Sequence, residues 1–282
     1  MLSPAAAVRA GWRFVLRLLE RIDAAELDLA AAGIAFYGFL AIFPAVAAVI
    51  SIWGWGSDPS VIRAQIAVTR DFLPAQAHGL IHDQVEALLA ANTRHLGWAS
   101  LFSTLVALWS ARAGAAALIR GLNAAHRLPN RAGAWHILHA VMLTLLLVGV
   151  ALVAMLMSLV VPLVLVALPL GSFAQQVLAL ANFAVGMVVV VFGVALAYRM
   201  GPNRPRGEPR PIVTWGLVVA VGLWAAASRA FVVYLANFGN YNEIYGSIGA
   251  VVALLFWLYI SAYAVLLGAA VDAVRTPPTP AQ

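Results

Sequence analysis

The chain has 282 residues, of which 63% are hydrophobic and only 10% are charged, and its formal net charge is +6 at pH 7. This composition excludes an ordinary soluble globular domain, in which about 25% of residues are charged and about half are apolar. The lack of cysteine excludes disulfides, thiolate nucleophiles and cysteine-ligated metals.

Six long apolar segments follow one another along the chain. They cover residues 30–53, 97–120, 137–168, 176–198, 212–236 and 247–271. About 20 apolar residues cross a bilayer as a helix. A helix also pairs its backbone N–H and C=O groups internally, as the hydrocarbon interior requires. The sequence therefore predicts an all-α, polytopic membrane bundle with six transmembrane helices.

The arginines predict the orientation of this bundle. All 17 basic residues are arginine, and only three, Arg63, Arg70 and Arg94, fall on one side. Twelve fall on the other side, and those between the second and third segments are Arg120, Arg127 and Arg131. Because positive charge concentrates in cytoplasmic loops, we expect both termini in the cytoplasm. The same distribution explains the pI of about 10.3, so we expect no nucleic-acid partner.

The chain before the first segment, residues 1–27, is expected to form an amphipathic helix. Arg9, Arg13 and Arg17 share one helical face, and the opposite face is apolar. This pattern favours a helix lying on the cytoplasmic leaflet, with membrane lipids as partners. A solvated helix packed on the inner loops is the alternative.

The rest of the chain is expected to form one membrane domain, residues 28–275, followed by a disordered tail, residues 276–282. Pro44 and Pro162 lie inside apolar segments, where proline removes a backbone hydrogen bond and kinks a helix. The sequence therefore predicts two bent helices within the bundle.

The one sizeable outer loop, residues 54–96, is expected to form a periplasmic helical hairpin over the bundle. His78, His82 and Glu86 share one face of its second helix, a spacing at which imidazoles bind zinc. A tetrahedral site needs a further ligand, and a solvated polar face explains the three residues equally well. We therefore expect no metal and no cofactor.

Two arginines fall inside apolar segments. Arg112 lies in the inner half of the second segment and Arg229 in the outer half of the fifth. A charge near the bilayer centre costs about 2.5–3.5 kcal/mol on insertion scales, so it usually faces a polar cavity or a partner. The pair would form two steps of a path for an anionic group such as a phosphate.

The alternatives are structural. Both arginines are near enough to a membrane surface to snorkel. Arg112 would otherwise pair with Asp28 or Asp272, the carboxylates at the inner helix ends, and Arg229 with Glu243.

Further polar side chains occur within segments or at their ends, where they contact a substrate or join helices. These are Asn123, Asn182, Tyr241, Glu243 and Tyr245. A cluster of small residues at Gly246, Ser247 and Gly249 indicates close helix packing, or an outer gate at the start of the sixth segment. Such small-residue faces are compatible with a homo-oligomer.

The sequence does not support an enzyme, and no catalytic residue is assigned. No histidine follows His139, so Ser247 lacks an evident base, and Asp28 and Asp272 lie at segment ends rather than in the membrane. No Gly-x-x-x-x-Gly-Lys-Ser/Thr motif for ATP is present. A metal-dependent nuclease needs a cluster of ligands, and the inner loops and their flanks supply only Glu208, His126 and His136.

Several stretches between residues 10 and 275 resemble one family in their order and spacing. They are Ala32-Gly-Ile-Ala-Phe-Tyr37 with Phe43-Pro44, Leu108-Trp-Ser-Ala-Arg112, Gly121-Leu-Asn123, Tyr241-Asn-Glu-Ile-Tyr-Gly-Ser-Ile-Gly249, Trp257-Leu-Tyr-Ile260 and Leu267-Gly-Ala269. The chain is similar to the YihY/BrkB family of bacterial inner-membrane proteins. The resemblance implies six helices in the inner membrane. Family members carry a virulence label or a ribonuclease BN label, and the latter is regarded as a misassignment.

These observations lead to two hypotheses of different classes. The first is a transporter or lipid-handling protein, similar to a flippase or scramblase, for an amphipathic or anionic substrate. The alternative is a non-catalytic scaffold for envelope assembly partners, which would use the outer hairpin as its contact surface.

Overall fold

The computed structural model describes residues 4–53, 96–166, 174–205, 211–237 and 241–275, with eight further residues between 63 and 86. Over the continuous ranges the regular structure is helical, which confirms the all-α prediction. The helices are α1 (Pro4–Ala24), α2 (Leu27–Trp53), α5 (Leu96–His126), α6 (Gly133–Val166), α7 (Ala174–Met200), α8 (Trp215–Asn237) and α9 (Tyr241–Arg275).

The prediction of a polytopic membrane bundle is also confirmed. Among the described helices, α5 to α9 are each long and apolar enough to cross a membrane. Helices α1 and α2 pass the same test as a pair bent by 53°, so the candidate spans number five, or up to six. Each predicted segment lies within a helix or differs from it by a few residues at one end.

One helix extends well beyond its predicted apolar segment. The segment covers residues 97–120, and α5 continues to His126. It stops in a Schellman-type turn, in which Arg127 adopts a left-handed φ of 55° and Leu128 N–H donates to Asn123 O at 2.8 Å. Arg120 is therefore a residue of the helix rather than of a loop.

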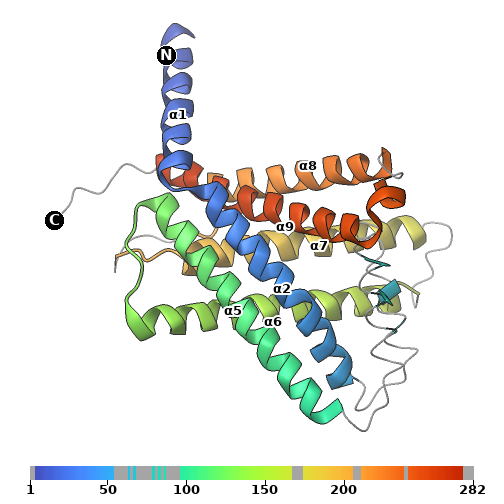
Figure 1. Ribbon diagram of the computed structural model, residues 1–282. Coiled ribbons are helices and arrows are strands. Elements are labelled where there is room, and N and C mark those ends of the chain that lie inside the picture. Colours follow the sequence, from blue (N-terminus) through green and yellow to red (C-terminus); the bar gives the residue numbers. More distant parts are fainter. Residues whose placement is uncertain are drawn as a thin grey trace.

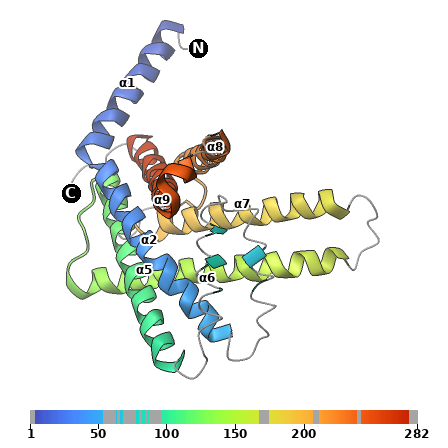
Figure 2. The same cartoon turned by 45° about the vertical axis from the view of Figure 1, so that its right-hand side comes forward.

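The helices pack as antiparallel neighbours. Helix α2 runs along α5, α9 packs between α2 and α8, and α6 pairs with α7. Both views show the α2–α5 pair crossing the α6–α7 pair at a steep angle (Figures 1 and 2).

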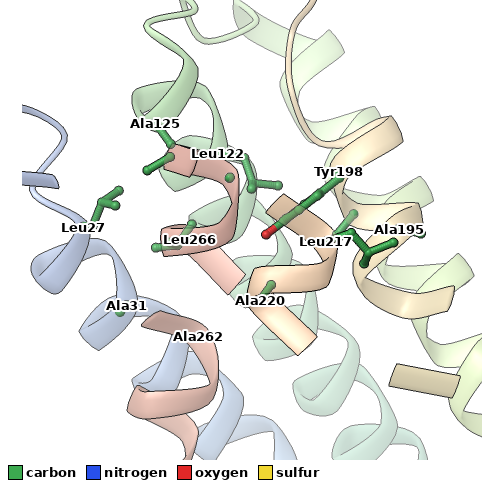
Figure 3. Packing of buried hydrophobic residues seen from close by; sticks show 13 residues of the cluster. Leu27, Ala31, Leu122, Ala125, Ala195, Tyr198, Leu217, Ala220, Ala262 and Leu266 are labelled. Carbon is green, nitrogen blue, oxygen red and sulfur yellow. The ribbon is translucent and has the colours of Figure 1, made fainter. Parts of the chain in front are cut away.

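The buried core gathers at one end of this arrangement. It joins the first turns of α2 and α8 to the last turns of α5, α7 and α9, through residues such as Leu27, Leu122, Tyr198, Leu217 and Leu266 (Figure 3). The Tyr198 hydroxyl donates to Val265 O across the α7–α9 contact. We call this the basic end, because its loops carry Arg127, Arg131 and Arg204.

Small residues allow two helices to touch at the basic end. A Cβ added at Gly216 of α8 would overlap Gly268 O of α9, and a Cβ added at Gly268 would overlap Gly216 O. Such close backbone approach is typical of helix packing in membranes.

Helix α1 projects from the basic end, away from the bundle (Figures 1 and 2). Only its last turns pack on the core, through Leu18 and Ile22. Five large apolar side chains of α1 are exposed, among them Val8 at 72% and Trp12 at 64%. The helix therefore has an apolar face that no described part of this chain covers.

Several predicted features lie largely outside the described residues. These are the hairpin of residues 54–96 and the tail of residues 276–282. Within the hairpin region, Arg63 forms a two-point ion pair with Glu86, with N–O distances of 2.7 and 3.1 Å. Pro44 and Pro162 lie inside α2 and α6, which remain helical through them, and the kinks stay a prediction.

Candidate functional site

A half-open recess of about 170 Å³ lies between α2, α5 and α6. Two arginines and a histidine contribute to its wall together with two aromatic rings and two alanines. The lining residues are Tyr37, Trp109, Arg112, Ala113, Ala116, Arg120 and His136. We call it the arginine recess.

The recess follows from the spacing of residues on α5. Arg112, Ala116 and Arg120 stand at i, i+4 and i+8, so they share one helical face. Ala116 is buried and its small side chain leaves space between the two arginines. A second small residue, Gly114, brings α5 against Tyr37 of α2.

Helix α6 supplies the remaining wall. Ala116 and Ile119 of α5 pack with Ala140 and Leu143 of α6 in a small buried cluster. This contact holds the first turn of α6, and therefore His136, beside the arginines. The recess thus depends on the packing of three helices, α2, α5 and α6.

The charges of the recess are not balanced within the described part of the chain. Neither Arg112 nor Arg120 has an acidic partner within 4.0 Å there, where the ion pairs are Arg63–Glu86 and His82–Asp83. The Nδ1 atom of His136 is buried and has no hydrogen-bond partner among the described residues. Guanidinium groups only donate hydrogen bonds, so the recess is suited to a negatively charged acceptor.

The two arginines lie at different depths. Arg112 precedes His126 by 14 residues, which corresponds to about 21 Å along α5, and Arg120 precedes it by six, or about 9 Å. The hydrocarbon core is about 30 Å thick. Arg112 therefore lies inside the span that α5 forms, and Arg120 lies nearer the basic end.

Asn123, one of the predicted polar residues, links two loops at the basic end. Its side chain is fully buried. Its Nδ2 donates to Asn130 Oδ1 at 2.9 Å, and its Oδ1 accepts the N–H of Asn203 at 2.7 Å. Arg131 completes the link by donating to the carbonyls of Gly201 and Pro202 at 2.9 and 3.0 Å. These contacts hold the basic end together next to the recess.

His126 also joins these loops. Its Nδ1 lies 3.0 Å from Leu122 O, and its Nε2 lies 3.1 Å from the Arg204 guanidinium. Because a carbonyl only accepts and a guanidinium only donates, this arrangement requires the neutral imidazole with its proton on Nδ1.

The predicted inner-end carboxylates lie at helix starts. Asp272, in the last turn of α9, accepts the N–H of Gly216 at 2.6 Å and so caps the start of α8. The N–H of Leu217 donates to Thr214 Oγ1 at 3.0 Å in the same cap. Asp28 is exposed in the first turn of α2, where the helix dipole favours a negative charge. Among the described residues, neither forms an ion pair with Arg112.

The structure does not bring Arg229 to the recess. It is exposed on α8 and is absent from the recess lining. A two-step path through Arg112 and Arg229 therefore stays a prediction. Gly249 is half-buried in α9. The side chains of the other predicted residues lie outside the described ones, namely Asn182, Tyr241, Glu243, Tyr245, Gly246 and Ser247.

The histidines between α2 and α5 have other neighbours. His78 Nε2 lies 3.1 Å from Ile66 O, and Glu86 is bound to Arg63. No group of three or more His, Asp or Glu residues that could hold a metal occurs in the described part of the chain.

Of the seven residues that line the recess, the sequence analysis assigned only Arg112 to a site. Arg120 was detectable, because its spacing from Arg112 places both on one face of a helix. Trp109 was detectable in the same way, because it precedes Arg112 by three residues on α5. Tyr37 and His136 carry no such signal, since only the packing of α2 and α6 on α5 brings them there.

Long apolar helices, short connections and arginine-rich loops at one end define a multi-pass α-helical membrane protein. The chain belongs to the family described as Virulence factor BrkB, which matches residues 18–280. This confirms the resemblance expected from its motifs.

Two relatives match nearly the whole chain. "Putative ribonuclease-like protein YfkH" from Bacillus subtilis is 27% identical over 93% of this chain and 94% of its own length. UPF0761 membrane protein Rru_A2625 from Rhodospirillum rubrum is 26% identical over 94% of this chain. The match covers 59% of the length of that protein. No solved structure matches. The family membership indicates a membrane protein, and the ribonuclease-like name belongs to the Bacillus relative.

Proposed function

We propose that this protein is a transporter or lipid-handling protein of the bacterial inner membrane, acting on an amphipathic or anionic substrate. The observation that carries the proposal is the arginine recess. Arg112 lies within a span and lines this recess without an acidic partner among the described residues. An intramembrane charge of this kind is expensive, so a substrate that neutralises it explains its presence.

The orientation belongs to the same proposal. Loops at the basic end carry Arg127, Arg131 and Arg204. The positive-inside rule places such loops in the cytoplasm, together with α1 and the end of α9. The exposed apolar side chains of α1 would then lie in the cytoplasmic leaflet, with its arginines among the headgroups. The arginine recess would lie in the cytoplasmic half of the membrane.

The test is translocation of a fluorescent phospholipid in liposomes that contain the purified protein. A membrane-impermeant reductant removes the signal of the outer leaflet, and further loss reports movement between leaflets. We expect movement that depends on the protein and falls at least tenfold in Arg112→Gln. Empty liposomes and a folded Arg131→Lys variant are the controls. If lipid movement does not depend on the protein, phospholipid is excluded as its substrate.

A scaffold for envelope partners is the second candidate, favoured by the exposed face of α1 and by the Arg63–Glu86 ion pair of the outer loop. The face of α1 and the loop that carries this ion pair are surfaces on which a partner protein could bind, rather than sites within the membrane. If this candidate is correct, Arg112→Gln leaves envelope assembly unchanged, whereas breaking the outer loop disrupts it. A growth assay under envelope stress separates the two.

A further inference from the structure

We infer that the arginine recess binds a phosphate group, and that the phosphate is the headgroup of a membrane phospholipid whose acyl chain follows α5. The inference rests on the proposed function and names the substrate class of the same site. Size, donor chemistry and the surface of α5 carry it.

The size of the recess admits a headgroup and excludes a whole amphipathic molecule. Pockets that enclose a drug-sized ligand usually measure about 300–1,000 Å³. The arginine recess measures about 170 Å³ and is half-open. A substrate with a large apolar part would therefore keep that part outside the recess, on the surface of the bundle.

The donors of the recess select the headgroup. Arg112 and Arg120 offer planar forks that match two oxygens of one phosphate. His136 adds a ring with an unpartnered nitrogen. Two arginines supply two positive charges, which match a phosphate monoester of about −1.5 to −2 at pH 7 more closely than a carboxylate. Phosphate monoesters should therefore bind more tightly than diesters.

The surface of α5 continues the same face as the arginines. Phe102, Leu105 and Trp109 precede Arg112 at spacings of three, four and three residues, so they form one stripe with it. Their exposed fractions are 69%, 57% and 58%. The stripe changes from cationic near the basic end to apolar away from it, as a phospholipid does from headgroup to tail.

The length of the stripe fits one leaflet. Ten residues separate Phe102 from Arg112, which corresponds to about 15 Å of helix. This is about half of the 30 Å hydrocarbon core. The acyl chain of one leaflet is therefore long enough to run from the recess along these side chains.

Lipid binding to the purified protein in detergent, followed by native mass spectrometry, tests the inference. The probes share their acyl chains and differ in headgroup: phosphatidic acid, phosphatidylglycerol and diacylglycerol. Inorganic phosphate is the fourth probe, because it presents the same chemistry without a tail. We expect the affinities to fall in the order phosphatidic acid, phosphatidylglycerol, diacylglycerol, with inorganic phosphate weaker than phosphatidic acid.

The variants assign the binding to the recess. Arg112→Gln and Arg120→Gln should each weaken phosphatidic acid binding about tenfold to a hundredfold, the usual effect of losing a charged hydrogen bond. Arg199→Gln is the matched control, since it removes an exposed arginine of α7 from outside the recess, and binding should stay within about twofold. If Arg112→Gln does not fold, Arg120→Gln and Arg112→Lys carry the test, and the lysine variant should bind with intermediate affinity.

Each outcome decides the inference. Equal binding of phosphatidic acid and diacylglycerol, or an equal loss of binding in Arg199→Gln, overturns the inference. Recess-dependent binding of inorganic phosphate as tight as that of phosphatidic acid retains the phosphate site and overturns the lipid as its source. Translocation that persists without recess-dependent binding overturns the inference and keeps the proposed function. Recess-dependent binding without translocation keeps the inferred phosphate site and overturns the proposed function.

Discussion

Arg112 offers a sharp test, because its two explanations predict stability changes of opposite sign. If the residue is kept for a ligand, Arg112→Met should stabilise the ligand-free protein, since no described acidic partner is lost. If Arg112 instead joins helices, the same substitution should destabilise the protein.

The expected magnitude follows from the position of the residue. An arginine at the centre of a span costs about 2.5–3.5 kcal/mol on insertion scales. Arg112 is half-buried and lines an open recess, so we expect only part of this cost to be regained, about 1–2 kcal/mol. Arg131→Met is the matched control. It removes two hydrogen bonds to Gly201 and Pro202 and should cost about 1.5–3 kcal/mol.

Thermal unfolding in detergent measures both changes, with the fluorescence of the nine tryptophans as the signal. One kcal/mol shifts the midpoint of a large domain by about 2–4 °C. We therefore expect a midpoint that rises in Arg112→Met and falls in Arg131→Met. A fall of similar size in both variants would refute the reasoning and make Arg112 a structural residue.

Three further predictions concern water access, packing and pH. Arg112→Cys should react with a membrane-impermeant thiol reagent much faster than Arg229→Cys, and equal protection of both would argue against a wet recess. Gly216→Ala should destabilise the protein by about 1–3 kcal/mol in the same unfolding assay, because its Cβ overlaps the backbone of α9; an unchanged midpoint would contradict the close contact. The hydrogen bond from Arg63 lowers the pKa of Glu86. Their ion pair therefore stabilises the segment between α2 and α5 at pH values above the ordinary carboxyl pKa. This stabilisation is lost as the pH falls through the lowered pKa of Glu86. Carboxyl NMR should show a lower Glu86 midpoint in the native chain than in Arg63→Gln, and identical midpoints would exclude the ion pair in solution.

The helices could be predicted from sequence because the membrane imposes a local rule. Each span must satisfy its own backbone and remain apolar over about 20 residues, and both conditions are visible in a single segment. Arg120 shows the limit of that rule. A charged residue ends an apolar run, but it does not end a helix, so α5 continues for six more residues to His126.

The site was less predictable, because its contacts join distant parts of the chain. Arg112 was detectable as a charge within a span, and this is a property of one segment. The link from Asn123 to Asn203 crosses 80 residues, and the cap from Asp272 to Gly216 crosses 56. No periodicity within one helix reveals such pairs, since they depend on how the helices meet.

The same contacts explain why a recess can persist where α5 crosses α6. The basic end is held by the buried Asn123 network, by the cap on α8 and by the core around Leu266. This end therefore fixes α5, and with it Arg120 and Arg112, within one to three turns of a rigid junction. Beyond it, the same face of α5 leaves its large apolar side chains exposed. A binding site needs groups that are held in place and a route of entry. Helix α5 holds its arginines in place near the basic end, and its exposed apolar stripe offers a route of entry. A lateral approach from the membrane is thus the route that the packing leaves open to an amphipathic substrate.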